Sequence, residues 1–174
     1  AAGPLAGLVV AIPILLIGLA TSNIEPMPKE PFILEGDSLF YAAAKWLVFG
    51  RFLPSNGEDV FINQLAKAGW TGLFITGLNL IPLGQLDGGH VAYTLLGRRA
   101  QRLYMPLIGA FLLLSFFNSS WLLWTMLLFF LGRVYATPLD TVTPLDSRRR
   151  RLGWFTLAVF VMVFVPDPLN LIQP

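Results

Sequence analysis

The chain has 174 residues, of which 55% are hydrophobic and 13% charged, with a formal net charge of +2 and a mean hydropathy of +0.67. A soluble domain carries about 25% charged residues, and apolar runs as long as those found here would leave large patches exposed to water. The absence of cysteine excludes disulfides and thiolate metal ligands, and short basic clusters beside apolar runs argue against nucleic-acid binding. We therefore predict an integral membrane protein.

The first apolar segment, residues 1–20, contains no charged residue and is just long enough to span a bilayer. Gly3, Gly7 and Gly18 favour close contacts with a neighbouring helix. The chain begins at Ala1 rather than at methionine, and its first run lacks the basic start of a signal peptide. We therefore expect the native protein to extend further upstream.

A more polar stretch follows at residues 21–63, with many prolines and most of the acidic residues. Within it, Leu39–Phe49 is a mostly apolar run interrupted by Lys45, and Asp37 or Ser38 is placed to cap a helix there. A run of this length favours an interfacial or re-entrant helix over a membrane span.

The remaining apolar segments predict a polytopic, all-α transmembrane bundle of about five spans plus short interfacial helices. After residues 1–20, the expected spans are Gln64–Leu83, Leu103–Phe117, Trp121–Tyr135 and Leu152–Val165, and a short helix at Val91–Leu96 stops at Gly97. We expect residues 1–174 to form one membrane domain: a span at 1–20, an outer-face insert at 21–63, a span with an irregular element at 64–97, and three further spans in 103–174.

The basic residues predict the orientation of these spans. Arg98, Arg99 and Arg102 precede the third expected span, and Arg133 and Arg148–Arg151 lie at or after the end of the fourth. Two spans separate the clusters, so both fall on one face, which the positive-inside rule assigns to the cytoplasm. We expect a prokaryotic-type plasma membrane, with the insert on its outer face.

Asp87 stands in a break between apolar segments. Pro82 removes a backbone donor, and Gly84, Gly88 and Gly89 permit unusual dihedral angles. A carboxylate at membrane depth costs about 2.5–3.5 kcal/mol on insertion scales, so a cation, a metal or helix-end N–H groups must stabilise it. Asp is also a favoured N-cap, so the pattern leaves two roles open, a functional site and a cap of the helix that begins at Gly88.

The spacing Asn79-x-x-Pro82-x-x-x-Leu86-Asp87-Gly88-Gly89-His90 resembles the NxxPxxxLDG element of the site-2 protease family of intramembrane zinc metalloproteases. The opening Ala2–Gly7 resembles the start of the helix that follows the zinc-binding helix of that family. The two matches bracket the chain as far as about Gly97. The resemblance implies that Asp87 is the third zinc ligand, that Asn79 is a catalytic residue near the active site, and that Pro82, Gly88 and Gly89 shape the break.

The chain departs from that family because it has no His-Glu-x-x-His motif. Its only histidine is His90, which we interpret as a polar residue in a short helix rather than as a ligand. A catalytic zinc takes three protein ligands and one open position. We therefore expect Zn²⁺ to need histidines absent from this chain, on a helix upstream of Ala1.

The implied function is zinc-dependent hydrolysis of peptide bonds in transmembrane substrates, with a locally unwound helix as substrate and the insert gating access. The expected partners are membrane lipid, a transmembrane protein substrate and a larger membrane complex, and no nucleic acid. Two alternatives stay open: a non-catalytic scaffold or subunit derived from a protease, and a transporter, in which a broken helix and a midplane acid also occur.

Overall fold

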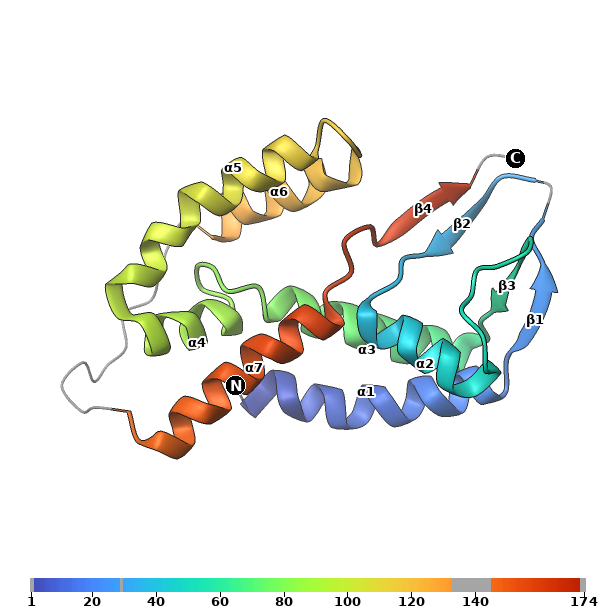
Figure 1. The fold of residues 1–174 in the computed structure, drawn as a ribbon, viewed down its shortest axis with the longest axis horizontal. Coiled ribbons are helices and arrows are strands. Elements are labelled where there is room, and N and C mark those ends of the chain that lie inside the picture. The colour runs from blue at the N-terminus through green and yellow to red at the C-terminus, as the bar shows by residue number, and fades with distance from the viewer. Residues whose placement is uncertain (1, 29, 133–144, 173–174) are drawn as a thin grey trace. The chain divides into compact units, whose positions relative to one another are not determined.

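The computed structural model describes residues 2–28, 30–132 and 145–172, and it is mostly helical (Figure 1). The helices are α1 (Ala2–Ala20), α2 (Leu39–Phe49), α3 (Gln64–Asn79), α4 (Asp87–Leu96), α5 (Tyr104–Leu114), α6 (Ser120–Leu131) and α7 (Ser147–Val163), with a 3-10 helix, η1 (Gly97–Leu103), between α4 and α5. The strands are β1 (Asn23–Pro26), β2 (Phe32–Glu35), β3 (Glu58–Phe61) and β4 (Leu169–Ile172).

The chain divides into two compact units, which are described separately below. Unit 1 consists of Ala1–Leu5 and Leu78–Val161, and unit 2 of Ala6–Gly77 and Met162–Pro174. Three helices, α1, α3 and α7, each contribute residues to both units.

The predicted bundle of five spans is not confirmed. In the part of the chain that the structure describes, α1 is the one helix long and apolar enough to cross a membrane. Helices α5 and α6 have 11 and 12 residues and measure about 17 and 18 Å, whereas the hydrocarbon layer is about 30 Å thick. The apolar runs at 103–117 and 121–135 therefore form shorter helices than their hydropathy indicated, and residues 133–135 lie outside the described residues.

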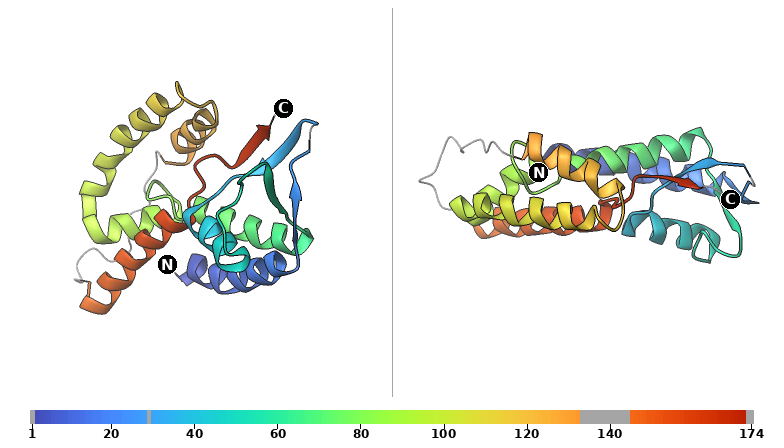
Figure 2. Two further views of the ribbon diagram at one scale, coloured as in Figure 1. Left: turned by 45° about the vertical axis from the view of Figure 1, so that its right-hand side comes forward. Right: turned by 90° about the horizontal axis from the view of Figure 1, so that it is seen from above.

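The presence of four strands differs from the predicted all-α fold. In unit 2, β1 pairs antiparallel with β3, and β2 pairs antiparallel with β4 near the end of the chain (Figure 2). Each strand has four residues, too few for an alternating pattern to stand out from the prolines and acids around it. The partner of β2 lies more than a hundred residues away in the sequence, so no local pattern marks the pair.

In unit 2, α1 and α3 pack at close range with antiparallel register. Gly69 lies against the backbone of Leu15, and Gly72 lies against Ala11, one turn further along each helix. An added Cβ on Gly69 would lie only 2.5 Å from the Leu15 Cα. Gly18 of α1 likewise lies against the backbone of Ala66 in α3, so the prediction of a close helix contact is confirmed for Gly18, and Gly69 and Gly72 of α3 add to the same contact.

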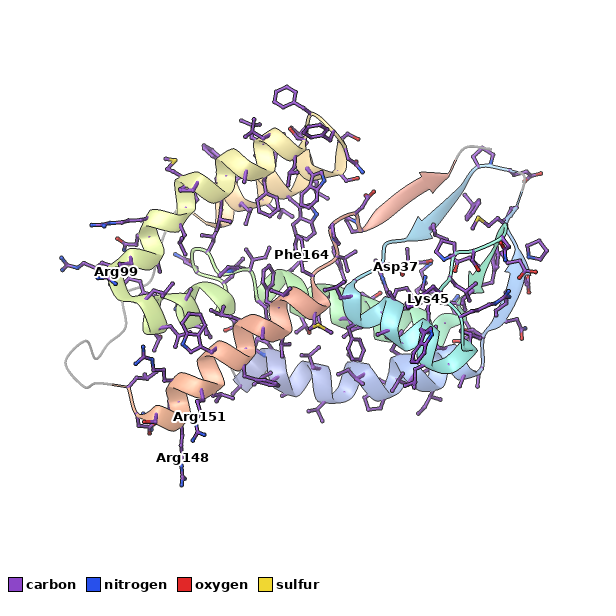
Figure 3. The ribbon with its side chains drawn as sticks, viewed as in Figure 1. Asp37, Lys45, Arg99, Arg148, Arg151 and Phe164 are labelled. Carbon is purple, nitrogen blue, oxygen red and sulfur yellow. The ribbon has the colours of Figure 1, made fainter. Side chains whose placement is uncertain are left out.

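Helix α2 has the predicted bounds, and Ser38 is its cap. The Ser38 Oγ accepts a hydrogen bond from the Tyr41 N–H at 3.1 Å, and Gly50 ends the helix with φ at +71°. Lys45, which interrupted the apolar run in the sequence, is 2% exposed, because its ammonium group turns toward Asp37 (Figure 3).

A small charged cluster therefore lies within unit 2. The Lys45 Nζ is 2.8 Å from Asp37 Oδ1 and 3.8 Å from Asp59 Oδ1, and it lies 4.9 Å from the centre of the Tyr41 ring. Burial raises the pKa of the Asp37 carboxyl, although the charge of Lys45 opposes that rise. Burial also raises the pKa of the Tyr41 hydroxyl above its ordinary value.

Candidate active site

The break between α3 and α4 in unit 1 is a compact, buried turn. Leu80 and Leu83 are fully buried, and Ile81 is nearly so. The Ile81 N–H donates to the Leu78 carbonyl at 3.2 Å, and the Leu83 N–H donates to the Ile81 carbonyl at 2.8 Å. Gly84 follows with φ at +64°, a conformation that favours glycine. The predicted helix break is confirmed, but α3 ends at Asn79, four residues before the expected end of the span.

Gly88 and Gly89 place the first turn of α4 directly against this turn. An added Cβ on Gly88 would overlap the Leu80 carbonyl, and one on Gly89 would overlap the Gly84 carbonyl, both inside the 3.0 Å that real Cβ atoms keep. Any larger residue would push α4 away from the break. The geometry therefore agrees with a shaping role for both glycines, and Pro82 lies half-buried within the same turn.

Asp87 is the first residue of α4 rather than its cap. The cap position belongs to Leu86, with φ −67° and ψ 157°, and no side chain makes a capping hydrogen bond there. The prediction that Asp87 is the N-cap of a helix starting at Gly88 is therefore wrong. A carboxylate in the first turn still gains from the helix dipole, while its oxygens stay available to a ligand.

The Asp87 carboxylate faces the beginning of α1. Its Oδ2 lies 3.8 Å from the position that a Cβ on Gly3 would take, and both residues belong to unit 1. Sequence reasoning missed this contact, although both residues lay in the matched segments. Asp87 is exposed, so the described residues do not bury its carboxylate.

Asn79 and His90 lie in different surroundings. Asn79, the last residue of α3, lines a pocket of about 160 Å³ together with Ile81, Leu86 and Leu128. His90 is exposed, lies one turn after Asp87 and lines a second pocket, described below. The structure thus keeps Asn79 at the break, next to the residue that precedes Asp87.

The described residues do not make a complete zinc site. No group of three or more His, Cys, Asp or Glu side chains that could hold a metal ion occurs among residues 2–28, 30–132 and 145–172. A protein zinc site takes at least three such ligands. Asp87 fits the part of one oxygen ligand, with an exposed carboxylate at a helix start, and no reaction step through a metal follows from these residues alone.

Comparison with known proteins defines the class of this chain. The profile of peptidase family M50 matches residues 1–116, so the chain belongs to this family, the site-2 protease family, as the motif at Asn79–His90 indicated. No solved structure matches the chain.

The curated relatives are longer proteins from plants. "Probable zinc metalloprotease EGY2, chloroplastic" of Oryza sativa subsp. indica is 33% identical over 172 residues, covering 97% of this chain and 31% of the relative. The protein of the same name from Arabidopsis thaliana is 33% identical over 174 residues, with the same coverage, and "Probable zinc metalloprotease EGY1, chloroplastic" of Arabidopsis is 27% identical over 171 residues. The chain spans about a third of the length of these relatives. Their chloroplastic names lend no support to the expected prokaryotic plasma membrane.

Proposed function

We propose that this chain is part of a zinc metalloprotease that hydrolyses peptide bonds in membrane-embedded protein substrates, with Asp87 as one ligand of the metal. The observation that carries the proposal is the position of Asp87, whose carboxylate is exposed in the first turn of α4 and lies against Gly3 at the start of α1. Family membership and the zinc metalloprotease names of the relatives support the same conclusion.

Each site residue then has a defined part. Asp87 supplies one carboxylate oxygen, and the other ligands come from outside the described residues. Asn79 orients the substrate or stabilises charge at the break, while Gly88 and Gly89 hold α4 where Asp87 faces α1. Bound zinc would polarise the scissile carbonyl and lower the pKa of its water to about 7.

The membrane part of the proposal rests on α1. Its 19 residues measure about 28 Å, close to the thickness of the hydrocarbon layer. Because Gly3 lies in its first turn, Asp87 would then lie near one face of the membrane rather than at its midplane. The substrate is a transmembrane segment that unwinds near that face.

Zinc content tests the assignment of Asp87. In the full-length protein purified in detergent, Asp87→Ala should lower the bound zinc per chain about tenfold or more, because one of the residues that coordinate the metal is lost. His90→Gln is the matched control, since His90 lies one turn away on the same helix and should leave zinc content unchanged. Elemental analysis by mass spectrometry measures both.

Three results would contradict the proposal. Equal zinc in Asp87→Ala and in the wild type would remove Asp87 from the site. Wild-type full-length protein that binds no zinc would instead favour the alternative of a non-catalytic scaffold. Loss of zinc in His90→Gln but not in Asp87→Ala would show that His90, rather than Asp87, is the ligand.

A further inference from the structure

A second pocket, of about 250 Å³, lies between α4 and α7 in unit 1. We call it the α4–α7 pocket. Helix α4 contributes His90, Val91, Thr94 and Leu95. The segment that begins α7 contributes Leu145, Arg149, Leu152 and Gly153. Gly153 lets the two helices approach closely, since a Cβ there would lie only 3.0 Å from the Leu95 side chain.

The walls of this pocket are apolar, with few free polar groups. The Thr94 hydroxyl donates to the His90 carbonyl at 2.7 Å, so its hydrogen is already used. Arg149 offers the most donors: its Nε is 3.7 Å from Asp146 Oδ2, and both side chains are more than half exposed. A guanidinium has five N–H donors, so this loose pair leaves most of them for a ligand.

The surroundings of the pocket are strongly basic. Asp146 is followed after one residue by Arg148–Arg151, so four arginines face one carboxylate over a single turn. The Asp146 Oδ1 already accepts the Arg149 backbone N–H at 2.7 Å. Figure 3 shows Arg148 and Arg151 projecting from the start of α7, with Arg99 of η1 at the same end of unit 1. The complementary ligand carries negative charge.

The residues that follow the arginines indicate that the ligand also has an apolar part. On α7, Leu152, Trp154 and Phe155 are about half exposed, so an apolar and aromatic surface begins where the basic run ends. Basic residues next to aromatic and apolar ones are typical of a helix at the boundary between lipid headgroups and acyl chains. A free phosphate ion would leave the apolar walls of the pocket unused, and an acidic peptide would leave this surface uncovered.

We propose that the α4–α7 pocket binds an anionic phospholipid, with its phosphate on the Arg149 guanidinium and the upper part of an acyl chain against Val91, Leu95 and Leu152. The inference rests on the membrane part of the proposed function and is independent of the zinc site.

Native mass spectrometry of the full-length protein in a neutral detergent tests this assignment. The probes are phosphatidylglycerol and phosphatidylcholine with the same acyl chains. Arg149→Gln should weaken phosphatidylglycerol binding about tenfold, because a charge-assisted hydrogen bond is lost. Arg150→Gln is the matched control. It removes the same charge from the next residue, whose side chain does not line the pocket, and it should weaken binding less than twofold.

Every other outcome overturns the proposal. Equal losses in the two variants would mean a diffuse basic surface, and equal binding of phosphatidylcholine would mean no recognition of charge. Inorganic phosphate or a polyglutamate peptide that displaces the lipid at equal concentration would show that the apolar walls contribute nothing. The exposed pair of Arg149 with Asp146 contributes little to stability, so Arg149→Gln should keep the wild-type melting temperature. Its zinc content should also stay at the wild-type level, which separates failure here from failure of the protease proposal.

Discussion

Lys45 is a residue whose burial differs from what its place in the sequence suggests. In the sequence it interrupts an apolar run, and a solvated ammonium at an interface is the simplest interpretation. In the structure it is 2% exposed and lies between Asp37 and Asp59. Burying a cation is tolerated only when partners surround it, and here the partners come from the residue before the α2 cap and from β3.

Replacing Lys45 by methionine should destabilise the insert. Methionine keeps the volume but leaves the Asp37 and Asp59 carboxylates without their cation, at a cost of about 2–3 kcal/mol, since Asp37 is one-third exposed. Lys67→Met is the control: Lys67 is more than half exposed and lies 3.5 Å from Glu35, so its loss should cost less than the loss of the buried Lys45. Thermal unfolding in detergent compares the two variants.

The same variant should respond to pH in a defined direction. Burial already raises the pKa of Asp37, and loss of Lys45 removes the charge that opposes this rise. An acid with a raised pKa in the folded state contributes stability while protonated and loses it as the pH rises through that pKa. The deficit of Lys45→Met should therefore shrink as the pH falls through the folded-state pKa of Asp37, and a deficit that grows on acidification would contradict the cluster.

At the scale of elements, the contact of α1 with α3 determines which glycines are replaceable. Gly69→Ala should destabilise the protein by about 1–3 kcal/mol, because its methyl group would meet the backbone of Leu15 at 2.5 Å. Helix propensity alone predicts the reverse, since alanine is favoured over glycine by about 1 kcal/mol in a helix.

Gly109 provides the comparison for this prediction. It lies in α5 with nothing within 4 Å of an added Cβ, so Gly109→Ala should be neutral or slightly stabilising. Denaturant unfolding of both variants measures the difference. Equal effects of the two substitutions would show that α1 and α3 do not approach each other as described.

At the scale of the whole molecule, the end of the chain is bound to the insert within unit 2. β4 pairs with β2, and the Gly36 N–H donates to the Pro168 carbonyl at 3.0 Å. The Gly36 carbonyl accepts from the Trp70 indole N–H at 2.9 Å, so this segment joins β2 to α3 as well. A two-stranded ribbon is marginal by itself, and each strand therefore depends on the other.

Truncation after Val165 should release β2. We expect limited proteolysis between Pro31 and Glu35 to become about tenfold faster, because an unpaired strand opens locally at little cost. Truncation after Ile172 is the control, since it leaves β4 complete and should keep the wild-type cleavage rate. Identical rates for the two truncations would contradict the pairing of β2 with β4.

The sequence by itself determined the features that depend on neighbouring residues. The bounds of α2, its cap at Ser38, the presence of a helix break before Asp87 and the family signature around Asp87 are local patterns of propensity, capping and spacing. Tertiary structure decided the rest: the strand pairs, the burial of Lys45, the short lengths of α5 and α6, and the approach of Asp87 to Gly3. The pairing of β2 with β4 and the approach of Asp87 to Gly3 depend on partners far away in the chain, and no single segment of the sequence contains the free energy of packing against such partners.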